Sequence, residues 1–142
     1  MEPEHLSLKL TDAPDANDHA FVREQLRRFN LLHAPPDAHQ PLDIYARDAA
    51  GALAGGLLGG TYWGWLSIDI LWVREDLRGW RLGERLLRAA EAEAVKRGCK
   101  HAHVDTMDFQ AQAFYEKYGY TVWGVLEDLP EGHQRIYLRK DL

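Results

Sequence analysis

Residues 65–87 read W-L-S-I-D-I-L-W-V-R-E-D-L-R-G-W-R-L-G-E-R-L-L, and this stretch decides the fold. Its first part, Leu66 to Val73, is apolar apart from two residues, which is typical of a strand buried on both faces. A turn with two glycines follows, and from Leu82 onward apolar residues recur at helical spacing. A strand that runs through such a turn into a helix directs several backbone N–H groups toward one point, at the positive end of the helix dipole. The stretch therefore predicts a binding site for phosphate.

The turn carries neither of two common phosphate motifs. No Gly-Lys-Ser/Thr follows it and no G-x-G-x-x-G occurs, which excludes a nucleotide P-loop and a dinucleotide fingerprint. What it does contain is Leu71-x-Val73 followed by Arg78-x-x-Arg81-x-Gly83. This pattern resembles the pyrophosphate-binding signature of the GNAT family of acyl-CoA-dependent N-acyltransferases, written Arg/Gln-x-x-Gly-x-Gly/Ala. Arg81 stands where the family has glycine, and its guanidinium could add charge-assisted contacts to a phosphate. The alternative is an ordinary strand–turn–helix with solvated arginines.

The composition is that of a globular protein. We expect one domain over residues 1–142, with 46% hydrophobic residues, 27% charged residues and a net charge of −5. The negative charge argues against a nucleic-acid partner, and no apolar run is long enough to cross a membrane. No secretory signal is visible and Cys99 is the lone cysteine, so we expect a cytoplasmic protein without an internal disulfide.

Apolar periodicity predicts the remaining elements. We expect strands at 6–10, 42–47, 52–61, 66–73, 100–106, 121–126 and 134–139, and helices at 16–32, 82–97 and 110–117. The resulting order, β-α-β-β-β-α-β-α-β-β, matches the GNAT fold from end to end, an α/β fold with a mixed sheet of six or seven strands flanked by helices. A second anchor, F-Y-E-K-Y-G-Y at residues 114–120, is similar to the F-Y-E-K-x-G-F/Y signature of that family.

The segment 100–106 alternates between two faces. Ala102, Val104 and Thr106 share one face, and His101, His103 and Asp105 share the other. Two histidines beside an aspartate are compatible with a metal site, but no further ligands stand at the usual spacing. We therefore interpret these residues as a strand surface and expect no metal.

The resemblance implies where an acyl-CoA substrate binds. Strands 66–73 and 100–106 would be parallel and splay apart at their C-terminal ends. The backbone of Leu71, Trp72 and Val73 would then hold the pantetheine arm and polarise the acyl carbonyl. The backbone N–H groups of the turn would hold the pyrophosphate, namely those of Arg78, Gly79, Trp80, Arg81, Leu82 and Gly83.

Two residues are the candidates for catalysis. An alkyl ammonium, with a pKa of about 10, must lose a proton before it attacks a thioester. By resemblance, the helper would stand at Ser67 or Asp69; serine is a poor base, whereas burial in an apolar strand would make the Asp69 carboxylate a better one. Asp69 could instead anchor the substrate or bond backbone at a bulge, and a water chain could remove the proton. Tyr115 matches the tyrosine that protonates the departing thiolate in many members, the alternative being core packing.

One departure concerns the pantetheine contact. Family members often have an asparagine seven residues before the tyrosine, and here that position is Asp108, which we expect to be the N-cap of the following helix. Gln110 could take over the amide contact. The acceptor would bind between segments 30–40 and 128–135, where aromatic residues are available to cover a cation: Tyr62, Trp63, Trp65, Trp123 and His133.

The sequence thus predicts an acetyl-CoA-dependent N-acetyltransferase that acts on a primary amine of a small molecule or peptide. Transfer would be direct, since no histidine is placed to activate Cys99 as a nucleophile. The alternative is a non-catalytic acyl-CoA-binding or regulatory module on the same fold, suggested by Arg81 and the missing asparagine. The sequence does not identify the acceptor amine, and it leaves a homodimer open.

Overall fold

The computed structural model describes residues 5–142, and the chain divides into two compact units, Met1–Pro36 and Asp37–Leu142. The first unit holds one helix, α1 (Ala16–Leu31), whose N-cap Asp15 accepts a hydrogen bond from the N–H of Asp18 at 2.9 Å. The strand expected at residues 6–10 is wrong, because this segment has no regular structure. Alternation alone does not make a strand, since each strand also needs a neighbour to accept its ladder bonds.

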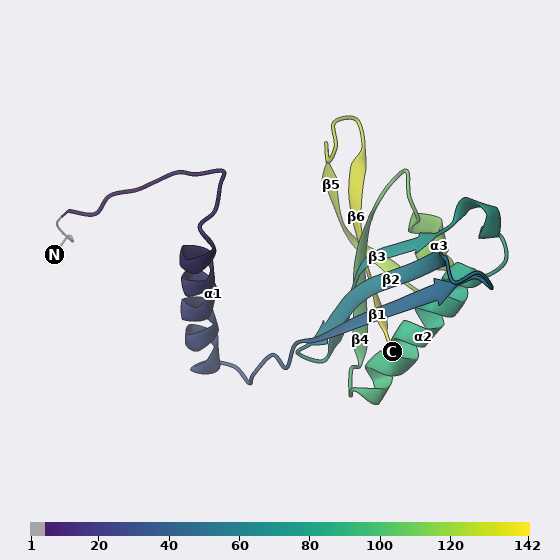
Figure 1. Cartoon of the computed structure of the whole chain (residues 1–142), viewed down its shortest axis with the longest axis horizontal. Helices are drawn as coiled ribbons and strands as arrows, with labels where there is room; N and C mark the ends of the chain where they lie inside the picture. The colour runs from purple at the N-terminus through teal and green to yellow at the C-terminus, as the bar shows by residue number, and fades with distance from the viewer. Residues whose placement is uncertain (1–4) are drawn as a thin grey trace. The chain divides into compact units, whose positions relative to one another are not determined.

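The second unit is built on a six-stranded sheet of order β1-β2-β3-β4-β6-β5 (Figure 1). Its parallel pair is β3 with β4, and the other neighbours are antiparallel. The strands are β1 (Gln40–Arg47), β2 (Leu53–Tyr62), β3 (Trp65–Val73), β4 (His101–Met107), β5 (Thr121–Glu127) and β6 (Gln134–Asp141). A short 3-10 turn, η1 (Glu75–Leu77), links β3 to α2 (Leu82–Lys96), and α3 (Gln112–Lys117) links β4 to β5.

The core lies between the sheet and α2. One stripe of α2 is buried, with Leu86, Leu87, Ala90 and Ala94 at helical spacing, and it meets the side chains that β2, β3, β4 and β6 present on the same face. A fully buried leucine such as Leu87 contributes about 1.5–3 kcal/mol to stability. Cys99 is buried beside this core, as expected for a small apolar residue.

The strand β3 is buried on one face only, so the expectation of burial on both faces is wrong. Ile70 and Trp72 are 55% and 46% exposed. The cause is a β-bulge: Ile68 pairs with Gly59 and Ile70 pairs with Leu58, so Asp69 is an extra residue without a partner on β2. The extra residue reverses the faces to which the following side chains point. Leu71 and Val73 therefore face the core, as Leu66 and Ile68 do before the bulge.

Strands β3 and β4 part midway along their length. Their pairing runs from Trp65 opposite His101 to Ile68 opposite Val104 and then stops, although β3 continues to Val73 and β4 to Met107. The expected splay is therefore present, and it opens the sheet beside the N-terminus of α2. Within residues 5–142, no helix is both long and apolar enough to cross a membrane.

Candidate active site

A cleft of about 900 Å³ opens where β3 and β4 separate. Its walls come from the end of β3, the turn before α2, the end of β4 and the segment leading into α3. The sequence-predicted residues that line it are Asp69, Leu71, Trp72, Val73, Arg78, Gly79, Arg81, Leu82, Gly83, Gln110 and Tyr115. The gap in the sheet and the turn at residues 78–83 thus share one cavity.

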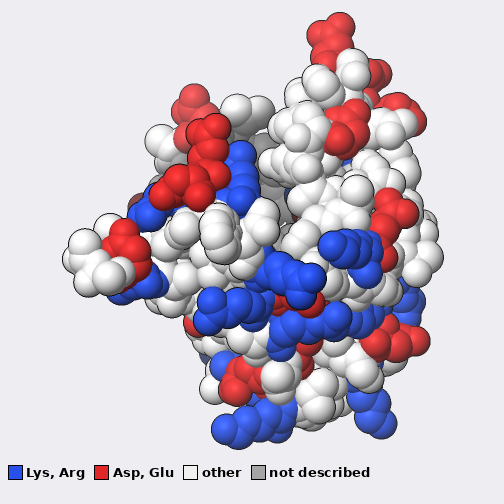
Figure 2. Space-filling model, turned by 90° about the vertical axis from the view of Figure 1, so that its right-hand side faces the viewer, with Lys and Arg blue, Asp and Glu red and all other residues white. Residues whose placement is uncertain are grey.

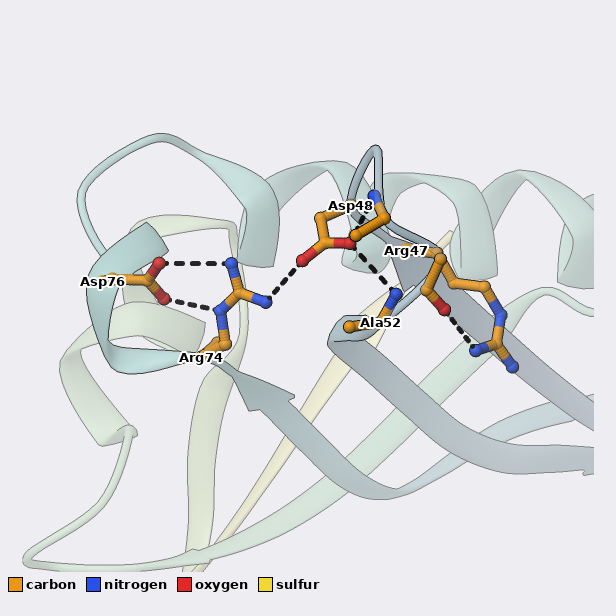
Figure 3. Close-up of polar contacts among 7 residues, drawn as sticks. Arg47, Asp48, Ala52, Arg74 and Asp76 are labelled. Carbon is orange, nitrogen blue, oxygen red and sulfur yellow. Dashed lines mark hydrogen bonds and ion pairs between the residues drawn. The ribbon is translucent and has the colours of Figure 1, made fainter.

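The turn is braced by Arg74, which the sequence analysis did not single out. Its guanidinium donates to Asp76 Oδ1 at 2.6 Å and to Asp48 Oδ2 at 2.9 Å (Figure 3). Asp48 in turn accepts from the N–H groups of Ala50 and Ala52, so it ties the β1–β2 turn to η1. The bonds from Arg74 lower the pKa of both the Asp48 and the Asp76 carboxyl groups, which keeps the brace charged at neutral pH.

Four backbone N–H groups of the turn remain available to a ligand. The N–H groups of Arg78 and Trp80 donate to Glu75 and Leu77 carbonyls at 3.2 and 3.4 Å, so the expectation that all six residues offer theirs is too broad. Within residues 5–142, no backbone acceptor is found for the remaining four, and the first bond of the helix is from Arg85 to Arg81. The donors left for an anion are those of Gly79, Arg81, Leu82 and Gly83.

Arg81 is the N-cap of α2 and has a left-handed backbone, with φ of 61°. This conformation explains why glycine is usual here, since a side chain with φ above zero is strained. The Arg81 side chain makes no capping bond and is exposed at the cleft. Figure 2, which faces the end of the molecule bearing this turn, shows basic side chains gathered across the middle of that face.

The backbone of β3 faces the gap at alternate residues. The N–H of Arg74 donates to the Ala54 carbonyl on β2 at 2.8 Å, which fixes the alternation of this antiparallel ladder. Trp72 therefore directs its backbone groups to β2, whereas Leu71 and Val73 direct theirs toward β4. The expectation that all three are free is corrected to these two, and the Val73 carbonyl already accepts from Arg78 Nε at 3.4 Å.

Tyr115 lies on α3 and is 3% exposed. It makes ring contacts with Phe114 and Tyr120, so it does pack in the core. No buried polar side-chain atom among the described residues lacks a hydrogen-bond partner, and no protein partner is found for the Tyr115 hydroxyl. The hydroxyl is therefore open to the cleft that Tyr115 lines. Burial, helped by the nearby Asp105 carboxylate, raises the pKa of Tyr115 to about 12.

Two carboxylates also line the cleft. Asp69 occupies the bulge; it is exposed rather than buried, and its Oδ1 accepts from the Ser67 hydroxyl at 3.2 Å. Asp105, which the sequence analysis assigned only to a strand surface, lines the same cleft and is paired with Arg135. The last pair between β3 and β4 is Ile68 with Val104, so Asp69 and Asp105 are the first residues of the two strands beyond this pairing. Within residues 5–142, Asp69 belongs to no ion pair.

The segment between β4 and α3 differs from expectation. Asp108 does not cap α3, whose N-cap is Ala111; its two oxygens accept from His133 Nδ1 at 3.0 Å and from the Gln134 N–H at 3.1 Å. Gln110 lines the cleft, but its side-chain oxygen accepts from Thr106 and from the Met107 N–H. Asp108 thus holds the start of β6, because its side chain points across to that strand.

The aromatic residues expected at the acceptor surface do not form one group. His133 lies near the cleft, where its ring meets Phe109, a cleft-lining residue that the sequence analysis missed. Trp65 stacks on His101 instead, and Trp123 packs against Tyr137 on the β5–β6 pair. Among the described residues, no three His, Cys, Asp or Glu side chains are placed to hold a metal ion.

A split mixed sheet, free N–H groups at a helix N-terminus and a phenol in the same cleft define an acyltransferase. A model of the Acetyltransferase (GNAT) family matches residues 6–120, and the chain belongs to this family. It is 42% identical over 121 residues to blasticidin-S acetyltransferase of Streptomyces morookaense, covering 82% of this chain and 85% of that protein.

Solved structures agree with this assignment. The crystal structure of an acetyltransferase from Agrobacterium tumefaciens superposes with a TM-score of 0.90 at 36% identity, over 96% of this chain and 100% of that one. A streptothricin acetyltransferase from Bacillus anthracis, solved in complex with acetyl coenzyme A, shares the fold at 19% identity and a TM-score of 0.64, over 72% of this chain and 62% of that one.

Proposed function

We propose that this acetyltransferase transfers an acetyl group from acetyl-CoA directly to a primary amine of a small molecule or peptide. The observation that carries the proposal is the shared cleft, in which the free N–H groups before α2, the gap after Ile68 and the Tyr115 hydroxyl all meet. The relative that acts on blasticidin-S supports a small-molecule acceptor, and the neighbour solved with acetyl coenzyme A supports the acetyl donor.

Residues of the turn would hold the pyrophosphate of the donor. The N–H groups of Gly79, Arg81, Leu82 and Gly83 supply hydrogen bonds at the positive end of α2, and the Arg81 guanidinium adds charge. Gly83 also has a packing role, because a Cβ there would lie 3.3 Å from the Phe114 ring. The turn and α3 are therefore fitted together beside the cleft.

Strand β3 and Tyr115 would act on the thioester. The N–H groups of Leu71 and Val73 face the gap, where a fixed donor stabilises the oxyanion that develops during attack. The amine nitrogen forms a bond to the acyl carbon, the carbon–sulfur bond breaks, and the thiolate takes the Tyr115 proton. Since the pKa of Tyr115 is raised to about 12, this proton is present throughout the neutral range. Asp69, which lines the same cleft, would receive the acceptor ammonium.

The proposal is tested in two measurements on the full chain. Calorimetric titration with acetyl-CoA should show one site per chain, and free thiol should appear when the protein and acetyl-CoA are mixed with a panel of amines. Absence of binding at millimolar acetyl-CoA contradicts the proposal. Binding without transfer to any amine in a broad panel favours the alternative of a non-catalytic acyl-CoA-binding module.

A further inference from the structure

A line of polar side chains runs along the sheet face that is turned away from α2. It begins at Asp69 in the cleft, where the Ser67 hydroxyl donates to the carboxylate. Ser67 is the register partner of His103 on β4. The His103 ring is then within 3.3 Å of the Tyr62 hydroxyl, measured from Nε2. The line thus leads from the bulge to Tyr62, which is near the hairpin joining β2 and β3.

The proposed reaction leaves one proton to remove. An acceptor that arrives as an ammonium ion loses one proton before attack and another when its nitrogen becomes an amide, while the thiolate gains one through Tyr115. The net yield is one proton for each acetyl group transferred. A carboxylic acid is a far stronger acid than an alkyl ammonium ion, so a carboxylate that takes up the acceptor's proton passes it on. The proton must therefore move on to solvent or to a neutral base nearby.

His103 is the neutral base that the fold places behind Asp69. It is half-buried, and burial lowers its pKa, while the carboxylates of Asp105 and Asp69 act in the opposite direction. Its imidazole is therefore uncharged near pH 7 and free to accept a proton. Asp105 is already paired with Arg135, which leaves Asp69 as the carboxylate that can deliver one.

We propose that His103 is a positioning residue for proton removal, which takes the acceptor's proton from Asp69 and passes it along the Tyr62 side of the sheet to solvent. This inference rests on the proposed function. The groups that face His103 come from all the neighbouring strands, and each can influence its titration: Tyr62 on β2, Ser67 and Asp69 on β3, His101 and Asp105 on β4, and its register partner Arg139 on β6.

The experiment compares pH profiles of kcat/KM for an amine that the wild-type protein acetylates. The wild-type profile should fall on its acid side below pH 6.5, because protonation of His103 blocks the transfer. His103→Gln should lower kcat by about tenfold or more and lose this acid limb, with unchanged affinity for acetyl-CoA. Added imidazole should restore activity to His103→Gly, a result that lost packing alone does not give.

The matched control is His101→Gln, on the same face of the same strand. His101 stacks on Trp65 and bonds Asp141 at 2.7 Å, but it is two register pairs farther from Asp69 than His103 is. Its variant should keep the wild-type profile. The double variant Asp69→Asn/His103→Gln should be no slower than the slower single variant, since both act on one proton. An unchanged acid limb in His103→Gln, or equal losses in His101→Gln, overturns the inference, whereas a wild-type protein without any transfer refutes the proposed function itself.

Discussion

Gly59 on β2 lies directly against the carbonyl group of Ser67 on β3, so closely that a Cβ at position 59 would collide with the Ser67 oxygen. The contact lies next to the bulge at Asp69, where β3 carries one residue more than β2. A bulged strand brings its backbone nearer to its neighbour, and glycine leaves room for that approach. The bulge that sets the direction of Leu71 and Val73 therefore depends on a glycine of the preceding strand.

Gly59→Ala should lower the free energy of unfolding by about 1–3 kcal/mol, the usual cost of forcing atoms into a filled site. It should also weaken binding of acetyl-CoA, because β3 must shift or lose its bulge. Urea denaturation and calorimetry check the two effects. Gly124→Ala on β5 is the control: its added Cβ would meet only Tyr137 Cβ, at 3.9 Å, so stability should hardly change. Equal stability of the two variants would contradict the role given to Gly59.

Arg81→Gly separates the charge of this residue from its backbone strain. We expect acetyl-CoA to bind about tenfold more weakly, because one charge-assisted contact to a phosphate is lost. Stability should stay within about 1 kcal/mol of the wild-type value, since relief of the left-handed backbone offsets the added freedom of the unfolded chain. Calorimetry and urea denaturation measure both quantities.

The control for this charge is Arg85→Gln, one turn along α2. Arg85 is exposed, and it lines a second groove on the β1 side of the helix rather than the cleft. Its loss removes the same formal charge and should change acetyl-CoA affinity by less than about twofold after screening by salt. If both variants bind equally weakly, general electrostatic attraction explains the effect and Arg81 has no particular role.

Local patterns predicted the turn at residues 78–83, α2 and the F-Y-E-K-Y-G-Y segment at residues 114–120. Each of these features is determined by residues close together in the chain, such as the glycines of the turn and the apolar period from Leu82 onward. The gap between β3 and β4 was an implication of family resemblance, and the pairing confirms it.

The remaining features depend on which residues face each other across strands. The bulge at Asp69 follows from the register of β3 against β2, and without it Asp69 appeared buried. Asp105 lines the cleft because the pairing of β4 with β3 stops at Val104. Asp108 bonds His133, which is 25 residues away in the sequence. Residues 6–10 alternate like a strand but lack regular structure, because alternation carries no information about a partner.

Tyr115→Phe should lower kcat by about 100-fold while acetyl-CoA affinity stays the same, because the variant removes the proton donor and keeps the packed ring. Initial rates of thiol release with a substrate amine give kcat, and calorimetry gives the affinity. Tyr137→Phe, on β6, removes a hydroxyl outside the cleft lining and should retain the wild-type rate. Full activity of the Tyr115 variant would leave this tyrosine with a packing role only.

Tyr115 also makes the free energy of unfolding depend on pH in the alkaline range. Burial raises the pKa of Tyr115 to about 12 in the folded chain, and burial together with the Glu91 carboxylate raises that of Tyr120 further. Below pH 10 both tyrosines keep their protons whether the chain is folded or unfolded, so their contribution to stability is complete and constant. Above pH 10 the unfolded chain loses these protons while the folded chain keeps them, and unfolding becomes easier.

The free energy of unfolding should therefore fall by about 1.4 kcal/mol per pH unit for each of the two tyrosines between pH 10 and 12, or about 2.7 kcal/mol per unit together. Urea denaturation at constant ionic strength from pH 8 to 11.5 measures this slope. Tyr115→Phe should show about half of the slope, because one of the two buried phenols is gone and the hydrogen bond from Tyr120 to Glu91, 2.9 Å long, is untouched. The ring of Tyr115 is buried against Phe114 and Tyr120, so its phenol should ionise less readily in the folded chain than in the unfolded chain. An equal slope in the wild-type protein and in Tyr115→Phe would contradict this prediction.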